Sequence, residues 1–564
     1  MKISAFTLTS SVMILAAIIP PAHAQQQPNP TSDRLIQPSD ELPQPLDNEE
    51  IFINPATPAE NTTSTDTTSL TITQINVQGS TVFTDTDFAP ILDSVTGDTT
   101  LGELNAAVTQ ITQLYLDAGY LTSRAVLPSQ PLENGNITIQ VIEGSLTDIE
   151  LNGLRHLRSG YVQSRLNLGI DAPLNVNDLE DELRLLNSDP NFDSLTVDLQ
   201  SGDRLGTSRL VLDIDEAKPF FGTAFIDNYS PASVGSERIG ANLGYRNLAG
   251  VGDVLKLGYT HTFTNGSNIW DLGYSLPLNS MNGTLGLRLV LDSNKITQSP
   301  FDALGIEGES TLYDVSFRQP LVRNPREEFA LSLGYSYKNG QTFLFNDVGT
   351  PFSVGAEADG TTRTSVIRFG QDYTRRDSQG AWSGRSQFNI GTGLFGSTTN
   401  EAPTPDSLFF SWLGQVVRVQ QLSPNNLLII QGDVQLSPDN LLASESFSIG
   451  GAQTLRGYRQ GARSSDNGWR FSIENRITLT KNTERGSLLQ IAPFFDMGTV
   501  WNNPSNPRQI NNEHFLAGVG AGLIWIPLED LTLRLDFALP LMNVGDRQDN
   551  LQDDGMYFNL SYTF

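Results

Sequence analysis

The segment Met556–Phe564, MYFNLSYTF, alternates large apolar side chains with side chains that carry a polar group. A period of two is the repeat of a β-strand, because successive side chains of an extended chain point to opposite faces. The segment is therefore predicted to be a strand with one apolar face and one polar face. The apolar face carries Met556, Phe558, Leu560, Tyr562 and Phe564, and the other carries Tyr557, Asn559, Ser561 and Thr563.

The same pattern extends through the whole C-terminal part of the chain, from about Lys218 onward. In Leu531–Leu539, LTLRLDFAL, the leucines and Phe537 alternate with Thr532, Arg534, Asp536 and Ala538. A soluble β-sandwich also alternates, but its strands are usually about 5–6 residues long. The strands expected here run for about 9–14 residues. That length predicts tilted membrane strands, with apolar side chains toward lipid and polar ones toward a wet lumen.

The number of strands predicts how the barrel closes. An even number of antiparallel strands returns both ends of the barrel domain, residues 218–564, to the same side of the membrane. Because the first strand ascends, the connections after odd-numbered strands face outward. The segment Ser448–Ser464, SIGGAQTLRGYRQGARS, follows the eleventh strand and is thus the sixth outer loop. Sixteen candidate strands begin near residues 220, 238, 253, 268, 284, 311, 328, 362, 381, 407, 426, 469, 487, 514, 531 and 556.

The sixth outer loop is rich in glycine and arginine, so we expect it to fold back into a water-filled lumen. On the thirteenth strand, parity directs Phe494, Asp496 and Gly498 into that lumen, which places a carboxylate within reach of Arg456. Opposite unit charges about 4 Å apart attract by ~4 kcal/mol at a surface-like dielectric, before the cost of desolvation.

The residues around Arg456 suit such a contact. A guanidinium binds a carboxylate through two parallel hydrogen bonds. Gly457 permits a tight turn at the tip of the loop, and Tyr458 can both pack and donate a hydrogen bond. The alternative is a flexible outer loop, with Asp496 as one of many solvated acids in the lumen.

The N-terminus has the pattern of a secretory signal. Lys2 precedes the apolar run Val12–Ile19, and small residues at Ala22 and Ala24 predict cleavage after Ala24, so residues 1–24 form the signal peptide. The run is shorter than the ~20 residues of a membrane-spanning helix. Residues 25–69 are rich in Pro, Thr and Gln and are predicted to be a mobile linker.

Residues 70–217 contain two copies of one β-α-α-β-β pattern, at 70–146 and 147–217. In the first copy, Leu70–Gly79 is expected to be a strand and Leu101–Gly119 a helix, with Thr100 and Glu103 as its capping box. The segment Thr84–Phe88, TDTDF, lacks the glycine and glutamate of a calcium loop and is expected to begin a short helix.

The second copy is expected to contain helices at 158–169 and 176–189, the latter with a capping box formed by Asn177 and Glu180. Strands follow at 194–202 and 207–217. Each copy should bury its helices on one side of a three-stranded sheet and leave one strand edge open.

Composition excludes several classes of function. The net charge of −28 argues against nucleic acid, whose phosphates require a basic surface. The absence of cysteine excludes thiolate metal sites and disulfides. Four scattered histidines, no H-E-x-x-H and no G-x-S-x-G motif argue against a metal site, a cofactor or an enzyme. Glycines alternate in GVGAG, Gly518–Gly522, which indicates a strand with one bare face rather than a nucleotide-binding turn.

Several of these segments together resemble a known family. Tyr115–Gly153 and Leu183–Ile214 are similar to the first and second periplasmic POTRA modules of two-partner secretion transporters, which export haemolysins and filamentous haemagglutinins. The tetrad LRGY of the sixth loop and the motif F-x-D-x-G on the thirteenth strand are similar to the family's signatures. The terminal Phe564 resembles the outer-membrane assembly signal. The matching motif residues are Leu455, Arg456, Gly457 and Tyr458 in the loop and Phe494, Asp496 and Gly498 on the strand.

The resemblance implies a monomeric pore in the outer membrane of a diderm bacterium, with its POTRA modules in the periplasm. These modules would receive an unfolded secreted partner protein, and the barrel-assembly machinery would insert the pore into outer-membrane lipid. An exposed sheet edge could bind an extended partner through backbone hydrogen bonds. The family often has an N-terminal plug helix, but the prolines between residues 28 and 58 leave no long helical run, so a plug helix that is present and one that is absent or short both stay open here.

Two other functions remain open from the sequence. An assembly factor that inserts other barrels would share LRGY and F-x-D-x-G, but such factors usually carry three or more POTRA modules. Only two modules fit between residues 70 and 217. A diffusion porin would not need N-terminal modules.

Overall fold

The computed structural model describes residues 42, 54–55, 67–131, 135–345, 347–482, 486–508, 514–545, 547 and 549–564. The predicted signal peptide, most of the linker and any plug helix there lie outside these residues. The chain divides into two compact units. One contains residues 1–48, 219–249 and 253–564, and the other residues 49–218 and 250–252. Within the described ranges, no helix has the length and apolar character needed to cross a membrane.

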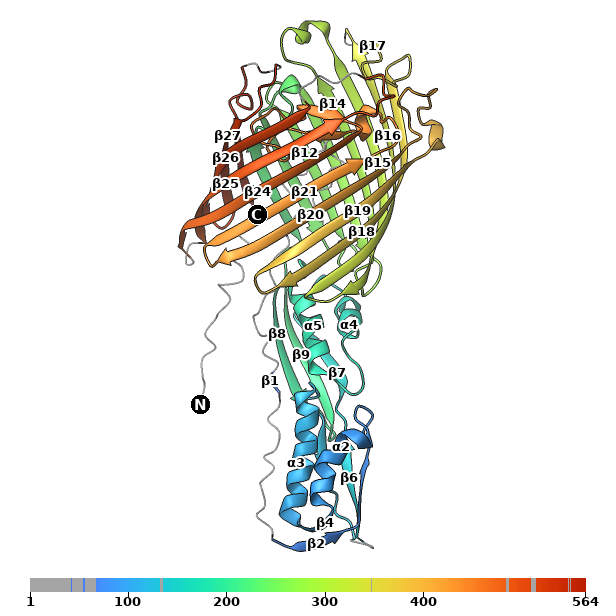
Figure 1. The fold of residues 1–564 in the computed structure, drawn as a ribbon, viewed down its shortest axis with the longest axis vertical. Coiled ribbons are helices and arrows are strands. Elements are labelled where there is room, and N and C mark those ends of the chain that lie inside the picture. Colours follow the sequence, from blue (N-terminus) through green and yellow to red (C-terminus); the bar gives the residue numbers. More distant parts are fainter. Residues whose placement is uncertain are drawn as a thin grey trace. The chain divides into compact units, whose positions relative to one another are not determined.

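The first unit is a closed antiparallel barrel whose strands follow one another in chain order (Figure 1). The two-residue β17 (Val348–Gly349) adds to the end of β16, which also pairs directly with β18, so sixteen strands span the wall. The predicted transmembrane barrel of sixteen antiparallel strands is confirmed. The spanning strands are β10 (Phe220–Asp227), β11 (Arg238–Arg246), β12 (Val254–Thr262), β13 (Ser267–Pro277), β14 (Thr284–Lys295), β15 (Glu307–Arg323), β16 (Glu327–Leu344), β18 (Thr361–Asp377), β19 (Gly380–Gly391), β20 (Phe410–Ser423), β21 (Asn426–Leu436), β24 (Asn467–Asn482), β25 (Ser487–Trp501), β26 (Phe515–Leu528), β27 (Leu531–Pro540) and β28 (Met556–Thr563).

The observed strands begin close to the predicted positions, but their lengths differ from the predicted lengths. The largest differences in position are at β15, expected near residue 311 and beginning at Glu307, and at β20, expected near 407 and beginning at Phe410. The predicted range of about 9–14 residues is wrong at both extremes. β10 and β28 have 8 residues, whereas β16 has 18. A tilted strand needs only about 9–11 residues to cross the hydrocarbon, so the ladder of β15, β16 and β18 continues beyond the membrane.

The seam between β10 and β28 closes the barrel. Five residue pairs form its ladder, from Thr223 with Thr563 to Asp227 with Asn559. Gly222 and Phe564 extend the seam by exchanging two backbone hydrogen bonds of 2.9 Å. A Cβ at Gly222 would lie 2.7 Å from the ring of Phe564, so a glycine is needed for this close approach.

A side chain extends the other end of the seam. The amide group of Asn228 donates to the carbonyl oxygen of Met556 (2.9 Å) and accepts from the amide of Phe558 (3.0 Å). Asn228 thereby satisfies backbone groups of β28 that would otherwise face the end of β10. The seam leaves no free strand edge, which a membrane protein requires.

Side-chain exposure follows the predicted parity. On β28, Tyr557, Asn559 and Ser561 are buried in the barrel, whereas Leu560 and Tyr562 on the outer face are 39% and 48% exposed. The apolar face of the C-terminal segment thus faces lipid, as the sequence predicted.

The first module of the second unit has the expected element types with two differences, a break in the first strand and an additional strand, β4 (Gly97–Thr100). The segment Leu70–Gly79 was expected to be a single strand, but it breaks at Thr73, whose amide donates to the carbonyl oxygen of Gly135 (2.8 Å). The predicted capping box of Thr100 and Glu103 is confirmed. The two halves of the broken strand join different sheets, β2 with β4 and β3 with β6. The elements are β2 (Ser69–Ile72), β3 (Gln74–Gln78), α2 (Asp85–Leu92), β4 (Gly97–Thr100), α3 (Leu101–Asp117), β5 (Arg124–Val126) and β6 (Asn136–Ile142).

The second module corrects the predicted cap. Its second helix begins at Val176, and the side chain of Asn175 accepts from the amide of Asn177 (3.0 Å), so Asn175 is the N-cap. The predicted capping box of Asn177 and Glu180 is wrong, because Glu180 instead pairs with Arg184 one turn later (2.6 Å). The elements are β7 (Ser145–Asn152), α4 (Ser159–Leu166), α5 (Val176–Asn187), β8 (Phe192–Ser201) and β9 (Thr207–Glu216).

A short piece of the linker joins the sheet of the second module. β1 (Asn54–Pro55) pairs in parallel with β8, opposite Asp198 and Leu199, which gives the order β1-β8-β9-β7. One predicted open edge of this module therefore carries a strand of the same chain. In the described residues, β7 forms the other edge of the sheet.

A glutamate at the end of the last strand closes each module. Glu143 accepts hydrogen bonds from the amides of Thr81 (2.6 Å) and Val82 (3.2 Å), in the turn after β3. Glu216 does the same in the turn after β7, where it accepts from the three successive amides of Arg155, His156 and Leu157 (2.8–2.9 Å). The two sequence copies therefore share a specific contact as well as an element order.

These contacts set the charge state of the two carboxyl groups. Burial by itself raises their pKa, but the hydrogen bonds they accept outweigh burial, so the pKa of each is lowered from its ordinary value of 4.5. A lowered pKa in the folded state means that the carboxylate stabilises its module fully above pH 4.5. This contribution is lost as the pH falls through the lowered pKa.

We predict that the turn after β7 loosens in acid. Hydrogen–deuterium exchange of the intact protein, corrected for intrinsic rates, should show loss of protection at Arg155, His156 and Leu157 as the pH falls below 4.5. The variant Glu216→Gln should exchange there roughly tenfold faster already at pH 7, because an amide accepts less strongly than a carboxylate. The control Glu150→Gln alters an exposed carboxylate on β7 and should leave protection unchanged. Equal protection in all three proteins at pH 7 would contradict the role of Glu216.

Candidate functional site

The connection between β21 and β24 is the predicted sixth outer loop, and it packs inside the barrel. It contains a short hairpin of β22 (Phe447–Ile449) and β23 (Arg463–Ser465). The loop folds inward as expected, but it also brings apolar side chains that the prediction did not include. The buried side chains of the resulting apolar core are Phe447, Ile449, Leu455 and Tyr458 from the loop and Leu413, Val500 and Leu516 from the wall.

Arg456 at the tip of the loop binds Asp496 of β25, as the parity argument predicted. Its guanidinium donates to both carboxylate oxygens, from Nε (2.7 Å) and Nη2 (3.0 Å), and its backbone amide donates to the same carboxylate (3.1 Å). Both residues are buried. Ser472 of β24 adds a fourth hydrogen bond to Asp496 (2.6 Å).

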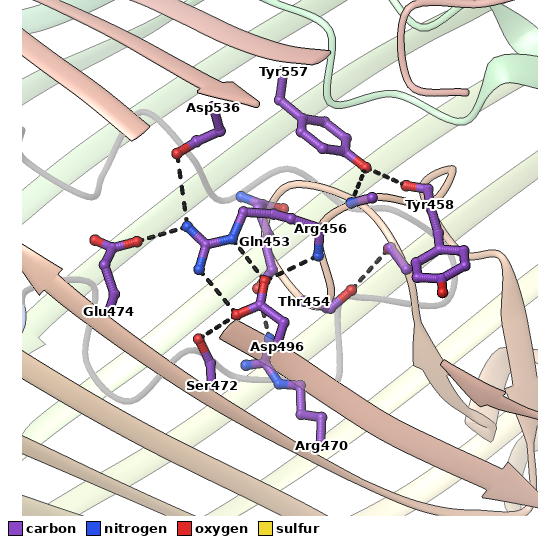
Figure 2. A network of polar contacts seen from close by, with 12 residues as sticks. Gln453, Thr454, Arg456, Tyr458, Arg470, Ser472, Glu474, Asp496, Asp536 and Tyr557 are labelled. Carbon is purple, nitrogen blue, oxygen red and sulfur yellow. Dashed lines mark hydrogen bonds and ion pairs between the residues drawn. The ribbon is translucent and has the colours of Figure 1, made fainter. Parts of the chain in front are cut away.

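Two further carboxylates surround Arg456 (Figure 2). Glu474 of β24 accepts from Nη1 at 2.6 Å, and Asp536 of β27 lies 3.7 Å from the same nitrogen. The guanidinium carbon also lies 3.3 Å from the centre of the Phe494 ring, a cation–π contact. Four wall residues from three strands thus hold one side chain of the loop.

The cluster balances its charges. Arg534 of β27 contacts both Glu474 and Asp536 at 2.7 Å, and Arg476 contacts Glu474 at 2.8 Å. Three guanidinium groups therefore alternate with three carboxylates. Such balance is needed because an unpaired charge in a low-dielectric interior costs several kcal/mol.

The residues after Arg456 fix the tip to the seam side of the barrel. Gly457 has a φ of 100°, which glycine adopts without strain, and its amide donates to the hydroxyl of Tyr557 (2.9 Å). That hydroxyl in turn donates to the carbonyl oxygen of Tyr458 (2.6 Å). Tyr458 donates to the carbonyl oxygen of Ala517 (2.8 Å) and accepts from the amide of Met542 (3.0 Å). The predicted packing and hydrogen bonding of Tyr458 are confirmed.

Residues outside the loop hold it on both sides of its tip, one in the wall and one in the connection between β27 and β28. Arg470 of β24, which pairs with Asp433 and lies opposite Gly498 in the ladder, donates to the carbonyl oxygen of Gln453 (2.6 Å). Arg459 pairs with Asp553 in the connection between β27 and β28. The loop is thus held at several points from Gln453 to Arg459.

Sequence reasoning found the pair of Arg456 and Asp496 but missed the rest of the cluster. The alternation of side chains already placed Arg534 and Asp536 on the lumen face. It does not show how far along the barrel axis a residue lies, because that depends on the tilt and stagger of the strands. Glu474 had a usable signal, since Arg470, Ser472, Glu474 and Arg476 alternate on one face of β24. Of the predicted site residues, Phe564 alone lies elsewhere, at the seam.

A closed sixteen-stranded barrel, an inward-folded loop held by an arginine, and N-terminal β-α-α-β-β modules together define an outer-membrane barrel of the POTRA-bearing class. Residues 206–524 match the family described as haemolysin secretion/activation protein ShlB/FhaC/HecB, and residues 70–144 match the ShlB-type POTRA domain. The chain belongs to this haemolysin secretion/activation protein family, whose members export a partner protein across the outer membrane.

Relatives and solved structures agree with this membership. The chain is 24% identical over 490 residues to the heme/hemopexin transporter protein HuxB of Haemophilus influenzae, covering 83% of this chain and 82% of that one. It is 24% identical over 503 residues to the hemolysin transporter protein ShlB of Serratia marcescens, covering 85% and 86%. The structure of CdiB from Escherichia coli has the same fold, with a TM-score of 0.70, 21% identity and coverage of 90% and 93%.

We predict that exchanging Arg456 and Asp496 does not restore function. In the double variant, an aspartate at position 456 would face Glu474 and Asp536, so the exchange builds a new repulsion. Removing one partner of a buried pair costs about 3–5 kcal/mol, and each single reversal and the double variant should lower secretion about tenfold or more. Secretion is measured as the amount of the exported protein in the medium.

The control for this exchange is Arg418→Lys, which alters an arginine pairing with Asp377 on the outer side of β20. That variant should secrete normally. Secretion at the level of the unmodified protein by the Arg456/Asp496 exchange would contradict the shared cluster and support an isolated ion pair.

We predict that Tyr557→Phe loosens the loop tip without changing its charges. The substitution leaves the buried amide of Gly457 and the carbonyl of Tyr458 without their partner, at about 1–3 kcal/mol. Proteolysis of the purified protein in detergent should cut between β22 and β23 several-fold faster than in the unmodified protein. The control Tyr562→Phe removes a lipid-facing hydroxyl and should not change the rate. Equal rates for both variants would show that Tyr557 does not hold the tip.

Proposed function

We propose that the chain exports one or a few large partner proteins, which its N-terminal modules receive as extended chains. The observation that supports this is the pairing of β1 with β8, because it is an extended segment bound through the backbone at a module edge. Backbone pairing places few demands on side chains, so the same chemistry suits a long repetitive passenger. The periplasm supplies no nucleotide, and folding of the passenger outside would give the direction.

We propose that residues 70–146 and 147–217 are two POTRA domains, preceded by a linker at 25–69 and followed by the barrel at 218–564. The repeated glutamate contacts of Glu143 and Glu216 support treating the second module as a copy of the first. We further infer that the protein acts as a monomer and performs no catalysis. During biogenesis, Phe564 would serve the barrel-assembly machinery as its recognition residue.

We infer that the Arg456 cluster holds the sixth loop in its resting position. We assign the restraint of the loop to Arg456 and Asp496. Leu455, Gly457 and Tyr458 support Arg456 by packing or by hydrogen bonds. Phe494 stacks on the guanidinium, and Gly498 lies opposite Arg470 in the ladder. An arginine bound by several groups can leave only when they are released together, which suits a restraint that passenger entry must overcome.

Deleting the gene tests the proposed function against its rivals. Loss of one secreted protein from the medium, restored by the intact gene, is the expected result. A general loss of outer-membrane barrels would instead indicate an assembly factor, and slower uptake of small solutes alone would indicate a porin. Restoration by a gene lacking residues 70–144 would contradict a role for the first module in capture.

A further inference from the structure

The lipid-facing side of β12 and β13 carries aromatic and polar side chains toward its outer end. The outward direction is set by exposure, since Leu257 of β12 is 40% exposed and Leu272 of β13 is 42% exposed. Side chains two or four residues away along each strand share that face. Four of them form what we call the β12–β13 cluster: Tyr259, His261, Asn268 and Trp270.

The strand register arranges the outward side chains of β11 to β14 in three rows. The row nearest the turn between β12 and β13 is mostly polar, the second carries the tyrosine and tryptophan rings, and the third is made of four leucines. At about 3.3 Å per residue, the polar row lies ~13 Å along the strand from the leucine row. From β11 to β14 the rows are Ile239, His261, Asn268 and Ser293, then Ala241, Tyr259, Trp270 and Leu291, then Leu243, Leu257, Leu272 and Leu289.

The order of the rows places the cluster at the headgroups of the outer leaflet. β12 is the third strand of the barrel, so the short turn 263–266 that follows it is an outer connection. Aromatic side chains of membrane proteins concentrate where hydrocarbon meets headgroups, and an outward apolar band fills the space between. The leucine row therefore faces acyl chains, the rings lie at the boundary, and His261 and Asn268 lie among the headgroups.

Two hydrogen bonds orient the amide of Asn268. Its Oδ1 accepts from the hydroxyl of Tyr259 (3.1 Å) and from Nδ1 of His261 (2.7 Å). Because an amide oxygen only accepts, Nδ1 carries the hydrogen, and Nε2 of the neutral imidazole is an acceptor. Within the described ranges, neither Nδ2 of Asn268 nor Nε2 of His261 has a hydrogen-bond partner. The cluster thus offers a donor and an acceptor on neighbouring residues.

The rings beside this donor and acceptor form an apolar platform. The centroids of the Tyr259 and Trp270 rings are 4.3 Å apart, and the His261 ring lies nearly parallel to the Tyr259 ring at 6.5 Å. Trp270 remains 47% exposed, so its ring is accessible from the lipid side. The face of an aromatic ring carries partial negative charge and attracts C–H groups. A sugar ring has such C–H groups on its face and hydrogen-bonding groups at its edge, so it matches both parts of the cluster.

The aromatic side chains toward the periplasmic end of the same strands are arranged differently. Tyr274 of β13 lies opposite Leu255 and Leu287 in another outward row. Its hydroxyl donates to Asp253 of the same chain (2.9 Å). That tyrosine is satisfied within the protein, whereas the outer cluster keeps polar atoms for a ligand. An aromatic belt that only anchors the barrel at the membrane surface would not require this difference.

We propose that the β12–β13 cluster binds the sugar headgroup of a glycolipid of the outer leaflet. The sugar ring stacks on Trp270 and Tyr259, and its edge groups hydrogen bond to Nδ2 of Asn268 and Nε2 of His261. The acyl chains of the same molecule lie on the leucine row, which continues into the lipid-facing surface of the barrel. None of the four side chains carries a fixed positive charge, so the site recognises the sugar and not a phosphate group. This assignment does not depend on the export function.

Binding of purified lipid A, an acylated amino-sugar disaccharide, tests the ligand class. The full-length protein, delipidated in detergent, should bind one lipid A per barrel at least tenfold more tightly than phosphatidylethanolamine, as measured by native mass spectrometry. Removal of the lipid A phosphates should change the dissociation constant less than threefold. Equal affinity for the two lipids, or a tenfold loss on dephosphorylation, would overturn recognition of the sugar.

Substitutions on the lipid face test the location. Trp270→Leu and the double variant H261L/N268L should each weaken lipid A binding at least tenfold, because one removes the platform and the other the donor and acceptor. The matched control Trp382→Leu removes a lipid-facing tryptophan, 50% exposed, near the periplasmic end of β19, and should bind normally. Leucine suits a lipid-facing position, and heat-modifiable migration on gels checks that each barrel folds. Equal affinity in all three variants would overturn the site.

Discussion

Every backbone N–H and C=O group in the hydrocarbon of a membrane must find its partner within the protein, since no water is available there. This chain meets the requirement by joining its first and last barrel strands. The seam of β10 and β28 is short, and Gly222, Phe564 and the side chain of Asn228 extend it at both ends. Closure separates the lipid-facing apolar band from an enclosed lumen, and the period of two of each strand supplies the side chains of both faces.

Closure also produces the conditions for the Arg456 cluster. The Arg456 cluster is buried beside the apolar core of the sixth loop, so its surroundings have a low dielectric constant and its ionic groups must balance one another. Arg456, Arg476 and Arg534 alternate with three carboxylates for this reason. A guanidinium at the loop tip is better suited than an ammonium, because its planar fork engages Asp496 and Glu474 at the same time and stacks on Phe494.

Much of this architecture could be predicted from the sequence, and the failures have physical causes. Alternation is a local property, so strand positions and the inward orientation of Asp496 followed from it. Which wall residues meet depends on tilt and stagger, so the joining of Glu474 and Asp536 to Arg456 did not. The apolar core of the sixth loop was not predicted, because Phe447, Ile449 and Leu455 show no regular spacing in the sequence. They form a core only by packing against wall residues, among them Leu413 and Leu516. Asn175 and Asn177 are both suitable N-cap residues by type, so the sequence does not distinguish them. The helix begins at Val176, which makes Asn175 the N-cap.

The exchange of hydrogen bonds between Gly222 and Phe564 has a consequence for how the protein is made. The two residues are the far ends of the barrel sequence, so the ladder cannot close while any strand between them is still missing. Bringing β10 and β28 together closes a loop that contains the whole barrel, and the entropic cost of closing it comes before the seam contacts compensate for it. Folds with such distant contacts form slowly. The seam can therefore close only when β28 is available.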